Sequence, residues 1–168
     1  MDLFIVRHGV AVDIGEQGVL SDEERMLSSK GRSRTQEVAC GLNQLGCAPQ
    51  LILTSPLVRA RETAEILGDE LSLDRSPTEL EELAPGRPAS GMTEKLLEHP
   101  ESAILLVGHM PDLSFLASYL LTGDEGRLDI AFKKAGVCLI RFFDRVTPGG
   151  GTLQWVLPPK PLRSFARR

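Results

Sequence analysis

The sequence of 168 residues lacks the features of several large classes of protein. No run approaches the roughly 18 apolar residues of a membrane-spanning helix, and the first residues do not have the pattern of a signal peptide. The net charge of −4 provides no electrostatic attraction to nucleic acid. These absences predict a cytoplasmic protein that binds neither nucleic acid nor a membrane, and we expect a monomer.

Cysteine is scarce, with three residues in the chain. Cys40 and Cys47 lie on an expected helix, about 10.5 Å apart along its axis at roughly 1.5 Å per residue. A disulfide requires Cα atoms within about 7 Å, so these two should not pair within one helix. The three histidines show no HxH or DxD spacing, and CxxC is absent. We therefore expect reduced thiols, no metal and no cofactor.

What remains has the composition of a globular protein, with 42% apolar and 25% charged residues. Neither an internal repeat nor a long linker divides the chain, so residues 1–168 are expected to form one domain. Residues 157–168 carry basic side chains and no acidic ones. This segment predicts a basic tail at about 158–168, which is either flexible or a docking strip for an acidic partner.

Short apolar runs alternate with helical patterns, which predicts an α/β fold with a mostly parallel sheet. The strands expected in the parallel part are 2–6, 51–54, 73–76 and 103–107, and an antiparallel hairpin of 137–143 and 153–157 closes one edge. Helices are expected over 28–46, 56–71, 92–98 and 111–121, with a loop over 83–91. The predicted architecture is a three-layer α/β/α sandwich with an antiparallel edge.

Basic and imidazole side chains follow three of these strands. Arg7 and His8 come directly after the first strand, Ser55 and Arg59 follow the second, and His109 follows the fourth. In open parallel sheets, ligands bind beyond the carboxyl ends of the strands. The helices that follow aim their N-terminal N–H groups at the same edge, which favours an anion. The sequence therefore predicts an oxyanion site at this edge.

These residue types suit phosphoryl transfer. A phosphoryl group carries its charge on three oxygens, and the planar fork of arginine can bind two of them at once. A neutral imidazole can act as the nucleophile and hold the phosphoryl group covalently, and Arg7 beside His8 favours the neutral form. We expect Nδ1–H of His8 to donate to a backbone carbonyl, which leaves Nε2 free to attack.

Five segments carry a resemblance to a known family: 4–9 with Arg7-His8-Gly9, 25–31, 54–64 with Ser55-Pro56-Leu57-Val58-Arg59, 82–85, and 107–111 with Gly108-His109. In this order they resemble the histidine phosphatase superfamily, also called phosphoglycerate-mutase-like. Within it the chain is similar to the small SixA-type phosphohistidine phosphatases, over essentially its whole length. The resemblance implies a phosphoglycerate-mutase-like fold and a phosphatase that works through a phosphohistidine intermediate.

The resemblance also implies residue roles. His8 would be the nucleophile, Arg7 and Arg59 would clamp the phosphoryl oxygens, and His109 would donate to one of them. Arg25, where the family often has an arginine, would be a further oxyanion contact, or else a solvated surface group.

Gly9 joins the residues expected to bind substrate. His99, at a helix end, is expected to have no role. Arg61 lies about 200° around the helix from Arg59 and is expected to form a surface ion pair.

The presence or absence of a general acid helps to distinguish the possible substrates. Hydrolysis of a phosphate ester is accelerated about 10²–10⁴-fold by a general acid that protonates the leaving group. Glu82 is the first candidate, although it could instead be a structural or water-orienting group. Asp112 is expected in the first turn of its helix, and Glu79 and Glu81 on a solvated face. Phosphohistidine has a less basic leaving group and needs an acid less.

The short segment between the expected third and fourth strands leaves no room for a large lid, and an open site would admit a side chain displayed on another protein. We therefore expect a phosphatase that releases inorganic phosphate from phosphohistidine on a phosphorelay or phosphotransfer protein in signal transduction. Two alternatives stay open. One is a small-molecule phosphomonoesterase with Glu82 as its acid. The other is a non-catalytic phosphoprotein-binding module.

Overall fold

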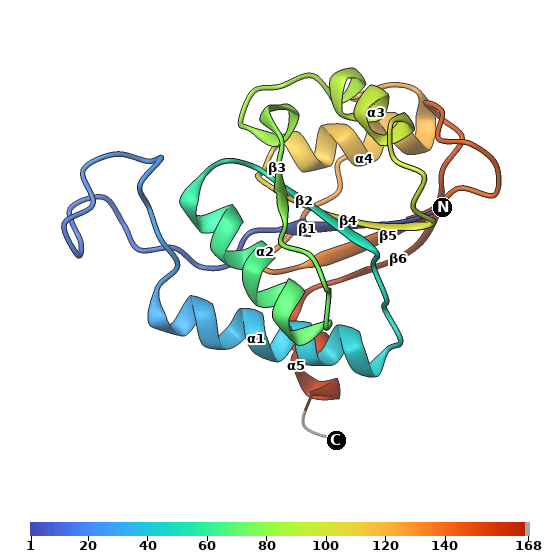
Figure 1. Cartoon of the computed structure of the whole chain (residues 1–168). Coiled ribbons are helices and arrows are strands. Elements are labelled where there is room, and N and C mark those ends of the chain that lie inside the picture. The colour runs from blue at the N-terminus through green and yellow to red at the C-terminus, as the bar shows by residue number, and fades with distance from the viewer. Residues whose placement is uncertain (167–168) are drawn as a thin grey trace.

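The computed structural model describes residues 1–166, which form one mixed six-stranded sheet covered by helices on both faces. The strands are β1 (Asp2–Arg7), β2 (Leu51–Thr54), β3 (Thr78–Glu79), β4 (Ala103–Gly108), β5 (Val137–Arg141) and β6 (Thr152–Leu157). The helices are α1 (Ser29–Gln44), α2 (Val58–Glu70), α3 (Ala89–Leu97), α4 (Asp112–Thr122) and α5 (Pro159–Phe165), with a 3₁₀ turn, η1, at Glu81–Leu83. Helices α1, α2 and α5 cover one face, and α3 and α4 cover the other (Figure 1). The predicted three-layer α/β/α architecture is confirmed.

The sheet has the strand order β3-β2-β4-β1-β5-β6. Strands β3, β2, β4 and β1 are parallel, whereas β5 and β6 run antiparallel as the predicted edge hairpin. Along the central strand β1, Leu3 and Ile5 pack toward α3 and α4, and Phe4 and Val6 pack toward α1 and α2. This alternation buries both faces of the strand and sets the register that places its last residue, Arg7, at the sheet edge.

Helix α1 begins where the sequence indicates. The Ser28 hydroxyl accepts a hydrogen bond from the Gly31 N–H at 3.0 Å and caps the helix. The buried positions Val38 and Leu42 then face the sheet at helical spacing. The long segment between β1 and α1 therefore ends at the Ser28 cap. This segment extends outward from the body of the molecule (blue in Figure 1).

The expected third strand at 73–76 is wrong, because this segment completes the end of α2 instead. The Leu73 N–H donates to the Gly68 carbonyl at 3.0 Å, and Ser72 adopts a positive φ of 56°, as in helix-terminating turns. Pro77 therefore lies just before the edge strand β3, whereas it was expected to end a strand at 73–76. The expected loop over 83–91 is also too long, since α3 already begins at Ala89, just after Pro88.

The basic segment expected as a tail forms helix α5 at Pro159–Phe165. Leu162 is fully buried, and Arg163 Nε donates to Glu37 of α1 at 2.7 Å. Helix α5 approaches α1 so closely that a Cβ on Gly41 would lie 2.0 Å from the Leu162 carbonyl oxygen. Apolar burial and the missing Cβ explain an ordered helix where charge alone suggested a free tail. Arg167 and Arg168 lie outside the described residues.

The described residues contain three free cysteines, which form no disulfide bond. Cys40, Cys47 and Cys138 are free thiols, and burial raises the pKa of Cys47 to about 11 and of Cys138 to about 12. Within residues 1–166, no group of three or more His, Cys, Asp or Glu side chains is placed to hold a metal ion. No helix of the described chain is long and apolar enough to cross a membrane.

Candidate active site

The two histidines expected in the site meet because their strands are parallel neighbours. Arg7 at the end of β1 lies in register with Gly108 at the end of β4, so His8 and His109 follow side by side. The His8 N–H donates to the Gly108 carbonyl at 3.1 Å, which continues the ladder by one bond. Their ring centroids lie 5.0 Å apart. The sheet register thus brings both imidazoles to one point at its carboxyl edge.

His8 is oriented as the sequence predicts. Its Nδ1 lies 2.7 Å from the Gly9 carbonyl oxygen, which can only accept, so Nδ1 carries the proton and Nε2 is unprotonated. The residue is 7% exposed. Burial is the main cause that lowers the pKa of His8 to about 3, with a further contribution from His109; the Gly9 carbonyl opposes the shift, and Arg59 and Arg7 add to it. His8 is therefore neutral at physiological pH, with a free lone pair on Nε2.

Arg59 lies in the first turn of α2 and faces that lone pair. Its Nε donates to His8 Nε2 at 3.3 Å, and the residue is 5% exposed. The other two guanidinium nitrogens are held by Asp22: Nη1 donates to the Asp22 carbonyl at 2.6 Å and Nη2 to Oδ2 at 2.8 Å. The guanidinium is thus locked against the nucleophile by a residue that sequence reasoning did not single out.

Arg7 is the last residue of β1 and directly precedes His8. Its Nη1 donates to the Phe132 carbonyl at 2.8 Å, which ties the guanidinium to the segment before β5. The Arg7 Nε atom is buried and has no hydrogen-bond partner among the described residues. A buried N–H without a protein acceptor is available to an anion.

His109 is 4% exposed, and its Nε2 lies 2.8 Å from the Ser55 hydroxyl. Burial lowers its pKa to about 4, and the positive charges of Arg59 and Arg7 act in the same direction, while Asp22 opposes them. Its Nδ1 is buried and, within the described chain, has no partner. His109 is thus a second neutral imidazole with one ring nitrogen left open.

Arg25 does not reach the histidines. Its guanidinium donates to the Val12 carbonyl at 2.7 Å, to Asp22 Oδ1 at 3.0 Å and to Asp13 Oδ1 at 3.2 Å. Asp22 therefore bridges Arg25 and Arg59, two of the three arginines that the sequence proposed as oxyanion contacts. Partial burial would raise the pKa of Asp22, but hydrogen bonds from Arg25 and Arg59 outweigh it and hold that pKa below the usual range. The Asp22 carboxylate thus binds the two guanidinium groups that were expected to bind a phosphoryl oxyanion.

The sequence contains only a weak signal for the role of Asp22. It is one of five acids from Asp13 to Glu24, in the long segment that follows β1 and His8. Nothing in that composition distinguishes the acid that turns inward from those on the surface.

Gly9 has a packing role. A Cβ on Gly9 would lie 2.5 Å from the Thr35 hydroxyl of α1, and the Gly9 N–H donates to the Thr63 hydroxyl of α2 at 3.0 Å. The missing Cβ allows the segment after His8 to pass this close to α1. Thr63, which sequence reasoning also missed, holds the segment in place.

Glu82 lies on η1 and lines a shallow hollow together with His109, Arg87 and Asp112. Asp112, in the first turn of α4 as expected, accepts a hydrogen bond from the Gly86 N–H at 3.1 Å. Glu82 therefore stands at the rim of the site, beside His109.

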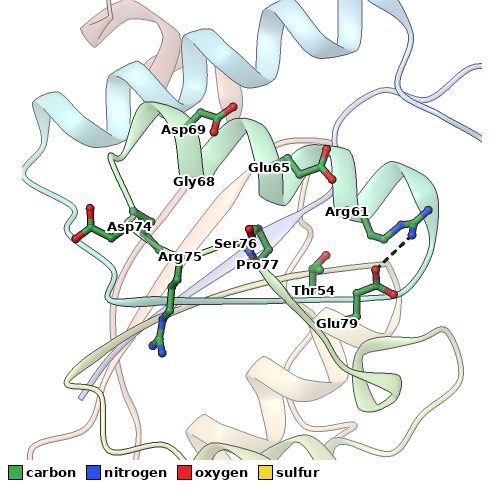
Figure 2. Close-up of a pocket in the computed structure, with 11 residues that line it drawn as sticks. Thr54, Arg61, Glu65, Gly68, Asp69, Asp74, Arg75, Ser76, Pro77 and Glu79 are labelled. Atoms are coloured by element: carbon green, nitrogen blue, oxygen red, sulfur yellow. Dashed lines mark hydrogen bonds and ion pairs between the residues drawn. The ribbon is translucent and has the colours of Figure 1, made fainter.

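A larger polar pocket of about 270 Å³ lies between α2 and β3 and contains neither histidine of the site (Figure 2). Arg61 points into it and pairs with Glu79 at 3.3 Å, which confirms the surface ion pair expected for Arg61. His99 also lies apart from the site, with Nδ1 3.8 Å from Glu101 Oε2 near the start of β4. Neither feature adds a group to the catalytic edge of the sheet.

Residues 3–98 match the model of the histidine phosphatase superfamily, branch 1. The chain belongs to this superfamily. Among its relatives, an uncharacterised protein of Picosynechococcus is 41% identical over 84% of this chain and 85% of its own. The phosphohistidine phosphatase SixA of Escherichia coli is 29% identical over 97% of both chains.

Solved structures of histidine phosphatases agree with the sequence relationship. The structure of the protein histidine phosphatase SixA complexed with tungstate matches with a TM-score of 0.82 and 27% identity, over 95% of this chain and 97% of that one. A SixA homologue from Agrobacterium tumefaciens matches with a TM-score of 0.75 at 19% identity, over 94% and 97% of the two chains, and supports the fold. The predicted SixA-type histidine phosphatase fold is confirmed, and with it an enzyme that hydrolyses phosphate bonds.

Proposed function

We propose that this histidine phosphatase removes phosphate from phosphohistidine on a signalling or phosphotransfer protein, with His8 as the nucleophile. The observation that carries the proposal is the state of His8: Nδ1–H is bound to the Gly9 carbonyl, and the free Nε2 faces the Arg59 guanidinium. The E. coli relative, named a phosphohistidine phosphatase, supports the substrate class.

In the first chemical step, the lone pair of His8 Nε2 attacks phosphorus while the bond from phosphorus to the substrate nitrogen breaks. When the other ring nitrogen of the substrate carries a proton, the leaving group departs as neutral imidazole and needs no acid from the enzyme. The Arg59 Nε–H, which now contacts Nε2, is placed to bind an oxygen of the transferred group. Arg7 and His109 offer buried N–H groups on the other sides.

In the second step, water attacks phosphorus and the bond to Nε2 breaks. The electron pair returns to Nε2, the water proton stays with the released inorganic phosphate, and His8 is again neutral with Nδ1–H on Gly9. The carbonyl that holds Nδ1–H therefore also keeps the phosphorylated ring in its cationic form, which is the better leaving group. One hydrogen bond thus serves both steps.

The surroundings of the site favour a substrate carried by a protein. Between β3 and β4 the chain forms only η1 and α3, and α3 packs beside α4 on one face of the sheet (Figure 1). A side chain displayed on another protein can therefore approach from the open carboxyl edge. We also propose that the enzyme acts as a cytoplasmic monomer, which sedimentation of the pure protein would test for the oligomeric state.

The direct test is phosphate release from a phosphohistidine-bearing transfer domain, with an aryl phosphate as the comparison ester. The wild type should release phosphate from the transfer domain faster than from the ester, and His8→Ala should abolish both activities. His99→Ala is the matched control, because His99 lies outside the site, and it should leave both rates unchanged. Rapid ester hydrolysis with a stable phosphohistidine domain would contradict the proposed substrate.

A small-molecule phosphomonoesterase remains the second candidate because Glu82 lies beside His109 at the rim. If Glu82 is a general acid, Glu82→Gln should remove the acid limb of a bell-shaped pH profile for the ester. Under the proposal, the same variant should change the rate on phosphohistidine by less than about threefold, since a neutral leaving imidazole gains little from an acid.

The non-catalytic binding module is disfavoured because the nucleophile is intact, unprotonated and in contact with Arg59. Tight binding of the phosphorylated domain without release from either substrate would restore it.

A further inference from the structure

Ser55 is the first residue after β2 and is fully buried beside His109. Its N–H donates to the Val107 carbonyl at 3.0 Å, so the backbone of Ser55 is fixed to β4 two residues before His109. Its hydroxyl oxygen lies 2.8 Å from His109 Nε2 and accepts a hydrogen bond from the Leu57 N–H at 3.3 Å. The hydroxyl is therefore held from two sides and faces a single ring nitrogen.

The position of the hydroxyl proton follows from its partners. A serine hydroxyl has one proton to donate, and the two contacts above are the hydrogen bonds of Oγ within the described chain. The Leu57 contact uses a lone pair and provides no acceptor. The Ser55 hydroxyl can therefore donate its hydrogen bond only to His109 Nε2. A ring nitrogen that accepts a hydrogen bond carries no proton of its own.

The second ring nitrogen completes the argument. A neutral imidazole with an unprotonated Nε2 carries its proton on Nδ1. In His109 the Nδ1 atom is buried, and the described residues offer it no hydrogen-bond partner. Arg7 Nε, on the residue directly before His8, is likewise buried without a partner among the described residues. A buried N–H group that lacks a protein acceptor is one that a bound oxyanion can satisfy.

We propose that Ser55 is a positioning residue that holds His109 as its Nδ1–H tautomer, so that Nδ1–H is the donor presented to the phosphoryl group. The opposite tautomer would turn a lone pair toward the anion and would leave the serine proton without an acceptor. This inference rests on the proposed function for its consequence in catalysis, but the tautomer itself is a property of the free protein.

The first test is therefore independent of activity. The chain has three histidines, so side-chain ¹⁵N NMR of labelled protein can resolve each ring, with single variants providing the assignment. In the wild type at neutral pH, His109 should show a protonated Nδ1 and an unprotonated, hydrogen-bond-accepting Nε2. A spectrum with the proton on Nε2 would overturn the proposal, whatever the enzyme hydrolyses.

The second test uses variants. Ser55→Ala should convert His109 to a mixture of tautomers and lower kcat about tenfold, which is less than the roughly 10²–10³-fold cost of removing a charge-stabilising donor outright. Ser55→Thr keeps the hydroxyl and should restore both the tautomer and most of kcat. Ser118→Ala is the matched control, because Ser118 is an equally buried serine that bonds to Asp124 instead. It should leave the His109 spectrum and kcat unchanged.

The readouts separate the possible failures. If Ser55→Ala lowers kcat but the His109 tautomer stays fixed, Ser55 acts only through packing and the proposal is wrong. If the wild-type tautomer is as expected but phosphohistidine is not hydrolysed, the failure lies in the proposed function and not in the assignment of Ser55.

Discussion

On one side of the candidate active site, His8 and His109 follow neighbouring strands, and backbone hydrogen bonds and the sheet register hold them in place. On the other side, Arg25 and Asp22 lie in the long segment between β1 and α1, and ion pairs between side chains hold them. The side chain of Asp22 is 49% exposed, whereas the whole of His8 is 7% exposed. The nucleophile side is thus part of the core, and the acidic side is part of the surface.

The two sides differ in how far they can change when a substrate arrives. Shifting the buried strand β1 by one residue would exchange the side chains that pack on its two faces and would disrupt both halves of the core, so the histidine side is preformed. In the pair with Arg59 the Asp22 side chain is 49% exposed, whereas that of Arg59 is 7% exposed. Phosphoryl oxygens that displace the Asp22 carboxylate would keep the buried guanidinium paired with an anion, while His8 and His109 stay where they are.

The largest effect is expected from Arg59, which joins the two sides. Arg59→Lys keeps the charge but loses the planar fork that contacts His8 and Asp22, and kcat/KM on phosphohistidine should fall about 10²–10³-fold. Arg61→Lys is the matched control on the same helix and should change kcat/KM by less than about twofold. Equal effects of the two substitutions would show that Arg59 has no special place in the site.

The pH dependence of stability tests the preformed side. The pKa values of His8 and His109, about 3 and about 4, lie below the usual 6.5. Between about pH 4 and pH 6.5 the unfolded chain therefore binds more protons than the folded chain. The free energy of unfolding should fall as the pH drops from about 6.5 toward 4. At pH 5 each histidine should account for a loss of about 1–2 kcal/mol.

Urea unfolding at pH 5 and pH 7 would measure this loss, and the double variant His8→Asn/His109→Asn should show a shallower pH dependence than the wild type. Activity should also persist down to about pH 5, because His8 stays neutral there. A loss of activity centred near pH 6.5 would mean that His8 titrates as an exposed histidine does.

A smaller effect is expected from Asp22, the carboxylate that bridges the arginines. Asp22→Asn removes a negative charge beside Arg59 while keeping the shape of the side chain, and inorganic phosphate should bind about threefold to tenfold more tightly. Calorimetric titration at low and high salt would measure this gain, which should shrink as salt screens the charges. Weaker phosphate binding by the variant would show that Asp22 orients Arg59 rather than competing with substrate.

The smallest effect is expected from Arg25, which the structure holds on Val12, Asp13 and Asp22 rather than on the histidines. Arg25→Gln should change kcat on phosphohistidine by less than about threefold. A loss as large as that of Arg59→Lys would mean that Arg25 moves to the phosphoryl group in the reacting complex.

The same contrast explains what the sequence could predict. His8 and His109 were predictable because each directly follows a strongly apolar strand, and parallel neighbouring strands bring such residues together. The contact of His8 Nδ1–H with a backbone carbonyl was expected, but the sequence alone could not fix the tautomer, because carboxylates also accept from Nδ1–H. Asp22 was not predictable, because an acid in a polar loop looks the same whether it turns toward solvent or toward Arg59.

Two errors in the fold have similar causes. Residues 73–76 have the composition of a short strand, but the Leu73 N–H is used by the end of α2. The segment that forms α5 was expected to be part of a basic tail, either flexible or a docking strip, because its charges are visible in the sequence. The close fit of Leu162 over Gly41 depends on a contact between segments far apart in the chain.

The central claim is that His8 carries the phosphoryl group during turnover. The most direct measurement mixes the enzyme with a phosphorylated transfer domain, stops the reaction in alkali, where phosphohistidine survives, and locates the phosphate by mass spectrometry. The account predicts a short-lived phosphoryl group on His8 that is absent from His8→Asn, together with loss of phosphate release in that variant. Phosphate on another residue, or undiminished release by His8→Asn, would contradict it.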